Sequence, residues 1–162
     1  MKYAIYLLVA LGFCFACTNP PDYPDEPEIE FLRLSKPNLD IPNRDSLLLT
    51  IGFTDGDGDL GYEDKTPNIF FIDKRTDSDT VFLTYATPMV SLQGAGNGIS
   101  GEISVVLNGI INVCCIYPDG SNPCQANPLF PTDTVVYEIY IKDRAGNESN
   151  RILADPIVLL CN

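Results

Sequence analysis

The stretch Ser46-Leu47-Leu48-Leu49-Thr50-Ile51-Gly52-Phe53-Thr54, followed by Asp55-Gly56-Asp57-Gly58-Asp59-Leu60-Gly61, sets the organisation of this chain. Its first half has the two-residue period of a β-strand, in which alternate side chains share one face. That face carries Leu47, Leu49, Ile51 and Phe53 and is predicted to be core. Its second half places a carboxylate at every second position. The stretch therefore predicts a core strand that runs directly into an acidic loop.

The three aspartates of this loop alternate with glycines, and their charges repel one another unless a cation lies between them. Ca²⁺ takes six to eight oxygen ligands, which alternating aspartates on a curled loop supply. The loop departs from the helix-loop-helix calcium motif, because its sixth position is Leu60 instead of glycine and its twelfth is Thr66 instead of glutamate. We therefore predict a calcium loop between strands; the alternative is a solvated acidic turn without an ion.

Residues 1–16 have the pattern of a secretory signal. Lys2 gives a positive start, and the apolar run over residues 3–13 is too short to span a bilayer stably. The segment ends in Cys14-Phe15-Ala16-Cys17, which resembles the lipobox of bacterial lipoproteins. We expect cleavage before Cys17 and lipidation of that cysteine; the alternative is an ordinary secreted protein that is cut nearby.

Residues 17–27 are rich in proline and acidic side chains and are predicted to be an extended tether. At about 3.1 Å per residue, this tether holds the folded part roughly 30 Å from the bilayer. An acidic stretch directly after the lipidated cysteine resembles the surface-export signals of lipoproteins in the Bacteroidota. The resemblance implies an outer-membrane lipoprotein that faces outward.

The net charge of the chain is −12. Such a surface repels nucleic acid and anionic lipid headgroups. The sequence also contains no basic patch with interleaved aromatic residues. We therefore exclude nucleic acid as a partner.

Four cysteines remain after the signal and the lipidated position: Cys114, Cys115, Cys124 and Cys161. An even number in an exported chain predicts two disulfides. Neighbouring residues on a strand point to opposite faces, so Cys114 and Cys115 need separate partners. We expect Cys124 to close a short loop with one of them and Cys161 to tie the final strand to the other. The alternative, a thiolate zinc site, lacks paired C-x-x-C spacing and histidine.

Residues 28–162 read as short strands and turns without a helical period. The expected strands cover residues 28–34, 46–54, 68–73, 80–85, 102–107, 110–116, 134–142 and 152–160. A brief pairing over residues 88–92 and loops over 37–44, 93–101 and 117–132 complete the pattern. Asn108-Gly109 is the strongest hairpin signal of the chain. Seven to nine strands over this length predict one all-β domain, an antiparallel two-sheet sandwich.

The segment Tyr137-x-Ile139-x-Ile141-x-Asp143, with Gly146, Asn147 and Ser149, resembles the last two strands of fibronectin type III and related bacterial immunoglobulin-like modules. Tyr137 fits the position whose hydroxyl ties a chain corner in that fold. From lipobox to final turn, the chain looks like immunoglobulin-like lipoproteins of the Bacteroidota. This resemblance implies an immunoglobulin-like sandwich and no defined activity. The absence of tryptophan separates the chain from antibody-type domains.

In such a sandwich, the loops after residues 46–54 and 134–142 lie at the same end, if these are the second and sixth strands. We therefore predict one calcium site. Its main ligands are Asp55, Asp57 and Asp59, with Glu63 and Asp143 as further candidates. For Asp143 and Asn147 the alternative is a simple turn role, because both residue types bond their own backbone.

An enzyme needs a group that transfers a proton or attacks a substrate. The chain has no histidine, its cysteines are expected to be paired, and it lacks G-x-S-x-G and Ser-x-x-Lys motifs. The sequence favours a non-catalytic binding or structural module that presents its loops to glycan or protein, with Tyr62 and Tyr140 as candidate stacking residues. The alternatives are a carbohydrate-binding accessory protein of a glycan-uptake system and a carboxylate-based glycoside hydrolase.

Overall fold

The computed structural model describes residues 22–76, 79–90 and 98–162. The predicted signal, Cys17 and most of the glycine-rich loop over residues 93–101 lie outside these ranges. The described strands are β1 (Glu28–Leu34), β2 (Asn38–Asp40), β3 (Ser46–Asp55), β4 (Ile69–Asp73), β5 (Val81–Tyr85), β6 (Ile99–Asn108), β7 (Thr132–Val135), β8 (Tyr137–Ile141), β9 (Ile152–Leu153) and β10 (Ile157–Leu160). No helix occurs in the described ranges, and the predicted all-β class is confirmed.

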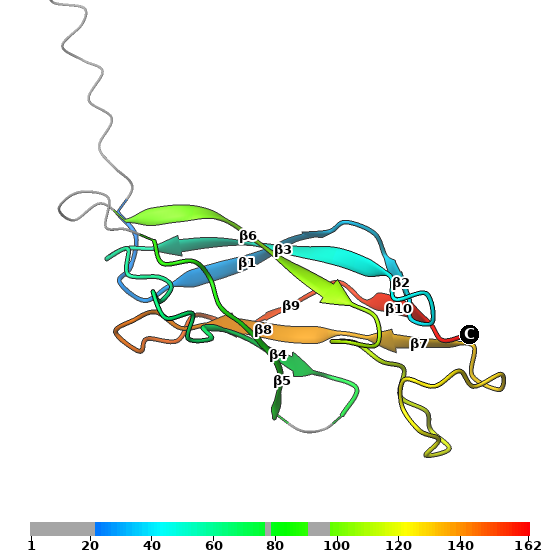
Figure 1. The fold of residues 1–162 in the computed structure, drawn as a ribbon. Coiled ribbons are helices and arrows are strands. Elements are labelled where there is room, and N and C mark those ends of the chain that lie inside the picture. Colours follow the sequence, from blue (N-terminus) through cyan, green and yellow to red (C-terminus); the bar gives the residue numbers. More distant parts are fainter. Residues whose placement is uncertain (1–21, 77–78, 91–97) are drawn as a thin grey trace, which may run out of the picture.

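These strands form three sheets, ordered β1-β3-β6, β5-β4-β8-β9 and β2-β10-β7. Figure 1 shows the first of them as one layer and the four-stranded sheet as a second layer across the core. The third sheet lies at the end that holds the C-terminus and is mixed, because β2 runs parallel to β10. Within the described residues, no helix is long and apolar enough to cross a membrane.

The core lies between the layers and follows the predicted alternation. Leu47, Leu49 and Ile51 of β3 are buried, and so are Ile139 and Ile141 of β8. Aromatic rings fill the centre: Phe71 and Tyr137 are both fully buried and meet edge to face with their centroids 5.6 Å apart.

Two predicted strands are each divided in the structure. Residues 134–142 form parts of β7 and β8, which separate at Val136 and join different sheets. Residues 152–160 form β9 and β10, which are separated around Pro156, a residue without an amide for the ladder. The predicted loop over residues 37–44 also contains the short strand β2, and residues 88–90 of the expected brief pairing form no strand.

The predicted hairpin at Asn108-Gly109 is wrong. β6 ends at Asn108, and the described chain has no strand over residues 110–116. Instead the amides of Asn112 and Val113 both donate to the Asn108 carbonyl, and Ile110 has a φ of 69°. The chain curls back on Asn108 here instead of forming a second strand, and Cys114 and Cys115 follow directly after this turn.

The two disulfides join Cys114 to Cys124 and Cys115 to Cys161, with sequence separations of 10 and 46 residues. This pairing agrees with the predicted arrangement, a short loop and a bond to the last strand. The bond to Cys161 lies beside the C-terminus, at the end of the domain opposite the one where β3 runs into the acidic loop (Figure 1). Two disulfides fit an extracytoplasmic, oxidising compartment.

Candidate metal centre

Asp55 is the last residue of β3, and strand alternation turns its side chain to the same face as Ile51. The side chain is fully buried, and neither carboxylate oxygen has a hydrogen-bond partner among the described residues. Asp57 is exposed and Asp59 is partly buried. Carboxylate oxygens of these three aspartates lie within 4.8 Å of one another. The structure therefore brings the three main predicted ligands together around a buried, unpartnered carboxylate.

The electrostatics of this cluster are unfavourable without a cation. Burial raises the pKa of Asp55 to about 7, and the negative charges of Asp57, Asp59 and Asp143 add to the effect. Burial also raises the pKa of Asp59, and the charge of Asp143 acts in the same direction. A group of oxygen ligands with excess negative charge has the chemistry that Ca²⁺ prefers.

Two glycines in left-handed conformations curl the loop. Gly58 has a φ of 70° and Gly61 a φ of 79°. A Cβ at Gly61 would lie 2.2 Å from the Pro88 carbonyl oxygen, so no other residue fits there. Between them, Leu60 is buried, and its carbonyl accepts a hydrogen bond from the Val90 amide. These contacts attach the loop to the rest of the domain directly after the cluster.

The loop after β8 meets the acidic loop, as was expected for the loops that follow these two strands. The Arg144 amide donates to the Asp59 carbonyl oxygen at 3.3 Å and to Asp59 Oδ1 at 3.2 Å. The Arg144 guanidinium donates to the carbonyls of Leu60 and Gly61 at 3.2 and 2.9 Å. Arg144 was not among the predicted site residues, because its place in a turn gives no signal of this distant contact.

Asp143 is buried, and its carboxylate bonds its own turn. Oδ1 accepts the amides of Gly146 and Asn147, each at 2.7 Å, and Oδ2 accepts the Asn147 side-chain amide at 2.8 Å. This is the turn role that was the alternative to ligation. In the described part of the chain, the acidic group comprises the three loop aspartates; Asp143 is not among them, and Glu63 is exposed.

The candidate stacking residues are engaged within the domain. Tyr140 is only 7% exposed, because its ring stacks on Phe70 at 4.8 Å and Arg151 covers it at 4.6 Å. The Tyr62 hydroxyl donates to the Asp143 carbonyl at 2.7 Å. The prediction of Tyr140 as an exposed platform is wrong. The buried Tyr137 hydroxyl has no hydrogen-bond partner in the described ranges, so the expected corner bond is not formed there.

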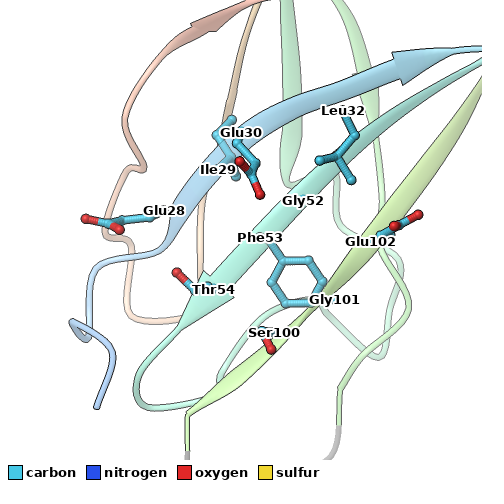
Figure 2. Close-up of a pocket in the computed structure, with 10 residues that line it drawn as sticks. All are labelled: Glu28, Ile29, Glu30, Leu32, Gly52, Phe53, Thr54, Ser100, Gly101 and Glu102. Atoms are coloured by element: carbon cyan, nitrogen blue, oxygen red, sulfur yellow. The ribbon is translucent and has the colours of Figure 1, made fainter. Parts of the chain in front are cut away.

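A shallow groove of about 490 Å³ crosses the β1-β3-β6 sheet near the same end of the domain. Figure 2 shows the residues that line it. Two cross-strand rows form it: Glu30, Gly52 and Glu102 lie opposite one another, as do Glu28, Thr54 and Ser100. Gly52 leaves the centre of the first row without a side chain. The groove mixes these polar groups with the apolar side chains of Ile29, Leu32 and Phe53. Arg33 pairs with Glu102 at 2.6 Å.

Comparisons with known proteins found no matching family model, no similar curated protein and no similar solved structure.

Proposed function

We propose that this chain is an exported lipoprotein, anchored to the outer membrane through Cys17 and facing outward, with a calcium-stabilised β-domain that acts as a non-catalytic binding or structural module. The signal-like start, the lipobox-like cysteine and the two disulfides support the export and the anchor. The order of strands in the β1-β3-β6 and β5-β4-β8-β9 sheets supports an immunoglobulin-like sandwich of the fibronectin type III kind.

The observation that carries the calcium proposal is the state of Asp55. A buried carboxylate without a hydrogen-bond partner is costly, and two further carboxylates lie beside it. A divalent cation would remove this cost, because Asp55, Asp57 and Asp59 would supply oxygen ligands to it and it would neutralise their charges. Extracellular calcium modules typically have Kd values of about 10⁻⁴ to 10⁻³ M.

The test is thermal unfolding with millimolar calcium and with chelator. Calcium should raise the Tm of the unmodified protein. Asp57→Ala should lower the Tm in calcium and leave it nearly unchanged in chelator, because its side chain is exposed and accepts only one long hydrogen bond, at 3.3 Å from the Asp59 amide. The exposed Asp155, far along the chain, gives a matched control, and Asp155→Ala should keep the calcium response. Equal Tm values of the unmodified protein under both conditions would contradict the calcium site.

A second candidate function is glycan binding in the groove of Figure 2. The observation that favours it is the row of exposed hydroxyl and carboxylate groups around Gly52, since such groups exchange hydrogen bonds with sugar hydroxyls. A hydrolase is less well supported at this groove: Arg33 lowers the pKa of Glu102 by hydrogen bonding to it, so Glu102 stays ionised and is a poor proton donor.

A glycan array tests this function directly. The unmodified protein should bind an oligosaccharide class, and Gly52→Val should lose that binding, because the added side chain fills the groove beside Glu30. If no glycan binds, the module serves a protein partner or a structural role, which a pull-down from outer-membrane extract addresses.

A further inference from the structure

The segment that precedes β1 lies on the acidic loop. The Gly56 amide, between Asp55 and Asp57, donates a hydrogen bond of 2.7 Å to the Pro24 carbonyl. Pro27, three residues later, is buried. The last residues of the predicted tether are thus held against the domain. Figure 1 shows the chain entering the domain at the end where β3 terminates, while the C-terminus lies at the other end.

Two glycines make this contact sterically feasible. A Cβ at Gly56 would lie 2.2 Å from the Tyr23 carbonyl oxygen and 2.5 Å from that of Pro24. A Cβ at Gly98 would lie 2.7 Å from Cδ2 of the Tyr23 ring. Gly56 is not among the glycines with positive φ, so its backbone conformation is open to other residues. The close approach of the Tyr23–Pro24 segment is what requires glycine there.

The loop that follows β8 holds the start of β1, five residues beyond Pro24. Asn150 Oδ1 accepts the Ile29 amide at 2.8 Å, and Asn150 Nδ2 donates to the Ile29 carbonyl at 2.9 Å. The entry of the chain is therefore attached both to the acidic loop, residues 55–61, and to the loop after β8; we call the end of the domain that carries these two loops the metal end. The attachment at Asn150 involves neutral groups, whereas the one at Gly56 is part of the acidic loop.

The contact at Gly56 and the convergence of the aspartates depend on the same backbone. A cation that draws the flanking carboxylates together fixes the curl of the loop and with it the direction of the Gly56 N–H. Without a cation, repulsion between the carboxylates opposes this curl. Because cation binding and docking of the Tyr23–Pro24 segment both require this loop conformation, each of them favours the other.

We propose that cation binding by Asp55, Asp57 and Asp59 is coupled to docking of the Tyr23–Pro24 segment, so that the cation controls whether the link to the membrane anchor lies on the domain. The inference rests on the proposed calcium site and on Cys17 as the anchor. With the segment docked, only six residues, 17–22, separate the predicted anchor from the docked contact, and six residues span at most roughly 20 Å. The cation then holds the domain closer to the bilayer, with its metal end toward the anchor.

The experiment measures amide hydrogen exchange of Gly56 by NMR in the full mature chain, with millimolar calcium and with chelator. We expect at least tenfold slower exchange in calcium, because the N–H is then held on Pro24. Coupling is reciprocal, so undocking must weaken calcium binding by the same factor. Gly56→Ala should lower the calcium affinity about tenfold in calorimetry. Gly52→Ala is the matched control, because its Cβ meets only the flexible Glu30 side chain.

Tyr23→Ala separates lost docking from a distorted loop, since it removes the ring against Gly98 and changes no loop residue. We expect it to weaken calcium binding about threefold. An unchanged affinity in Tyr23→Ala, together with Gly56 exchange that does not respond to calcium, would overturn the coupling and leave the metal site standing. Absence of calcium binding in the unmodified protein would overturn both proposals. If Gly56→Ala does not fold, the exchange measurement and Tyr23→Ala decide.

Discussion

The two ends of this domain both contain buried acidic side chains, and they differ in how these charges are matched. At the disulfide end, Arg75 is only 10% exposed and pairs with Asp73 at 2.5 Å and Asp133 at 2.6 Å. Its guanidinium also donates to the Cys114 carbonyl, directly beside the disulfides. At the metal end, Asp55 is fully buried and has no hydrogen-bond partner among the described residues.

The stability of the disulfide end therefore does not depend on ions or protons from solution, whereas the stability of the metal end does. The disulfide end is closed by two disulfides, and the Arg75 guanidinium balances its buried carboxylates. The metal end needs a charge from solution, either a proton or a divalent cation, to neutralise its carboxylates. We therefore expect one end to be insensitive to calcium and pH, and the other to respond to both.

The largest expected effect is removal of the bond between Cys115 and Cys161. The double variant Cys115→Ala, Cys161→Ala should lose about 4 kcal/mol of unfolding free energy, because the bond closes a long loop in the unfolded chain. Cys114→Ala with Cys124→Ala should lose about 3 kcal/mol. Urea denaturation measures both. Recovery of either loss by calcium would break the proposed independence of the two ends.

A neutral residue at Asp55 should have the next largest effect. In chelator at pH 8, Asp55→Asn should gain roughly 1–3 kcal/mol, because an unpaired buried charge is removed. It should also lose the stabilisation by calcium. Asp133→Asn is the matched control at the disulfide end: it weakens the Arg75 pair and should destabilise the domain equally in calcium and in chelator. Destabilisation of Asp55→Asn in chelator would contradict the unpaired state of Asp55.

The pH dependence follows from the raised pKa of Asp55. Its folded pKa of about 7 exceeds the ordinary value of 3.8, so between these values the folded protein binds more protons than the unfolded chain. The stability of the calcium-free protein should therefore fall as pH rises from about 4 to 7. Calcium affinity should rise over the same window, because the ion displaces the proton. Thermal unfolding in chelator across this window measures the first effect, and Asp55→Asn should flatten the curve.

The smallest effect is expected at Arg144, which joins the two loops of the metal end. Arg144→Gln should lose about 1 kcal/mol through its contacts to the Leu60 and Gly61 carbonyls. The exposed pair of Arg33 and Glu102 provides the control, and Arg33→Gln should change stability less than Arg144→Gln does, because solvent screens the pair. Urea denaturation in calcium compares the two variants; equal losses would show that the loops meet without help from Arg144.

Strand positions were predictable where alternation is continuous and ends at a turn. The expected strand over residues 28–34 matches β1, and that over 46–54 matches β3 to within one residue. The division of residues 134–142 was not predictable, because alternation continues through Val136 while the hydrogen-bond partners change from β10 to β4 and β9. Likewise, Asn108-Gly109 is a hairpin signal, but the amides of Asn112 and Val113 bond back to the Asn108 carbonyl instead of to a partner strand.

For the candidate site, the sequence showed which residues gather but not how they differ. Asp55, Asp57 and Asp59 are equivalent in the pattern, yet only Asp55 is fully buried. That difference arises from the core face of β3, which ends on Asp55. Asp143 lies in the loop that meets the acidic loop, as expected, but its carboxylate accepts the amides of its own turn instead of joining the three aspartates.

By itself, the sequence determined the all-β class, the main strands, the acidic loop and the number of disulfides, because these follow from alternation, turn residues and composition over short distances. Tertiary structure alone decided which carboxylate lacks a partner, that Arg144 holds the loop, and that the segment before β1 lies on Gly56. These features depend on burial and on contacts between residues far apart in the chain, which no local pattern encodes.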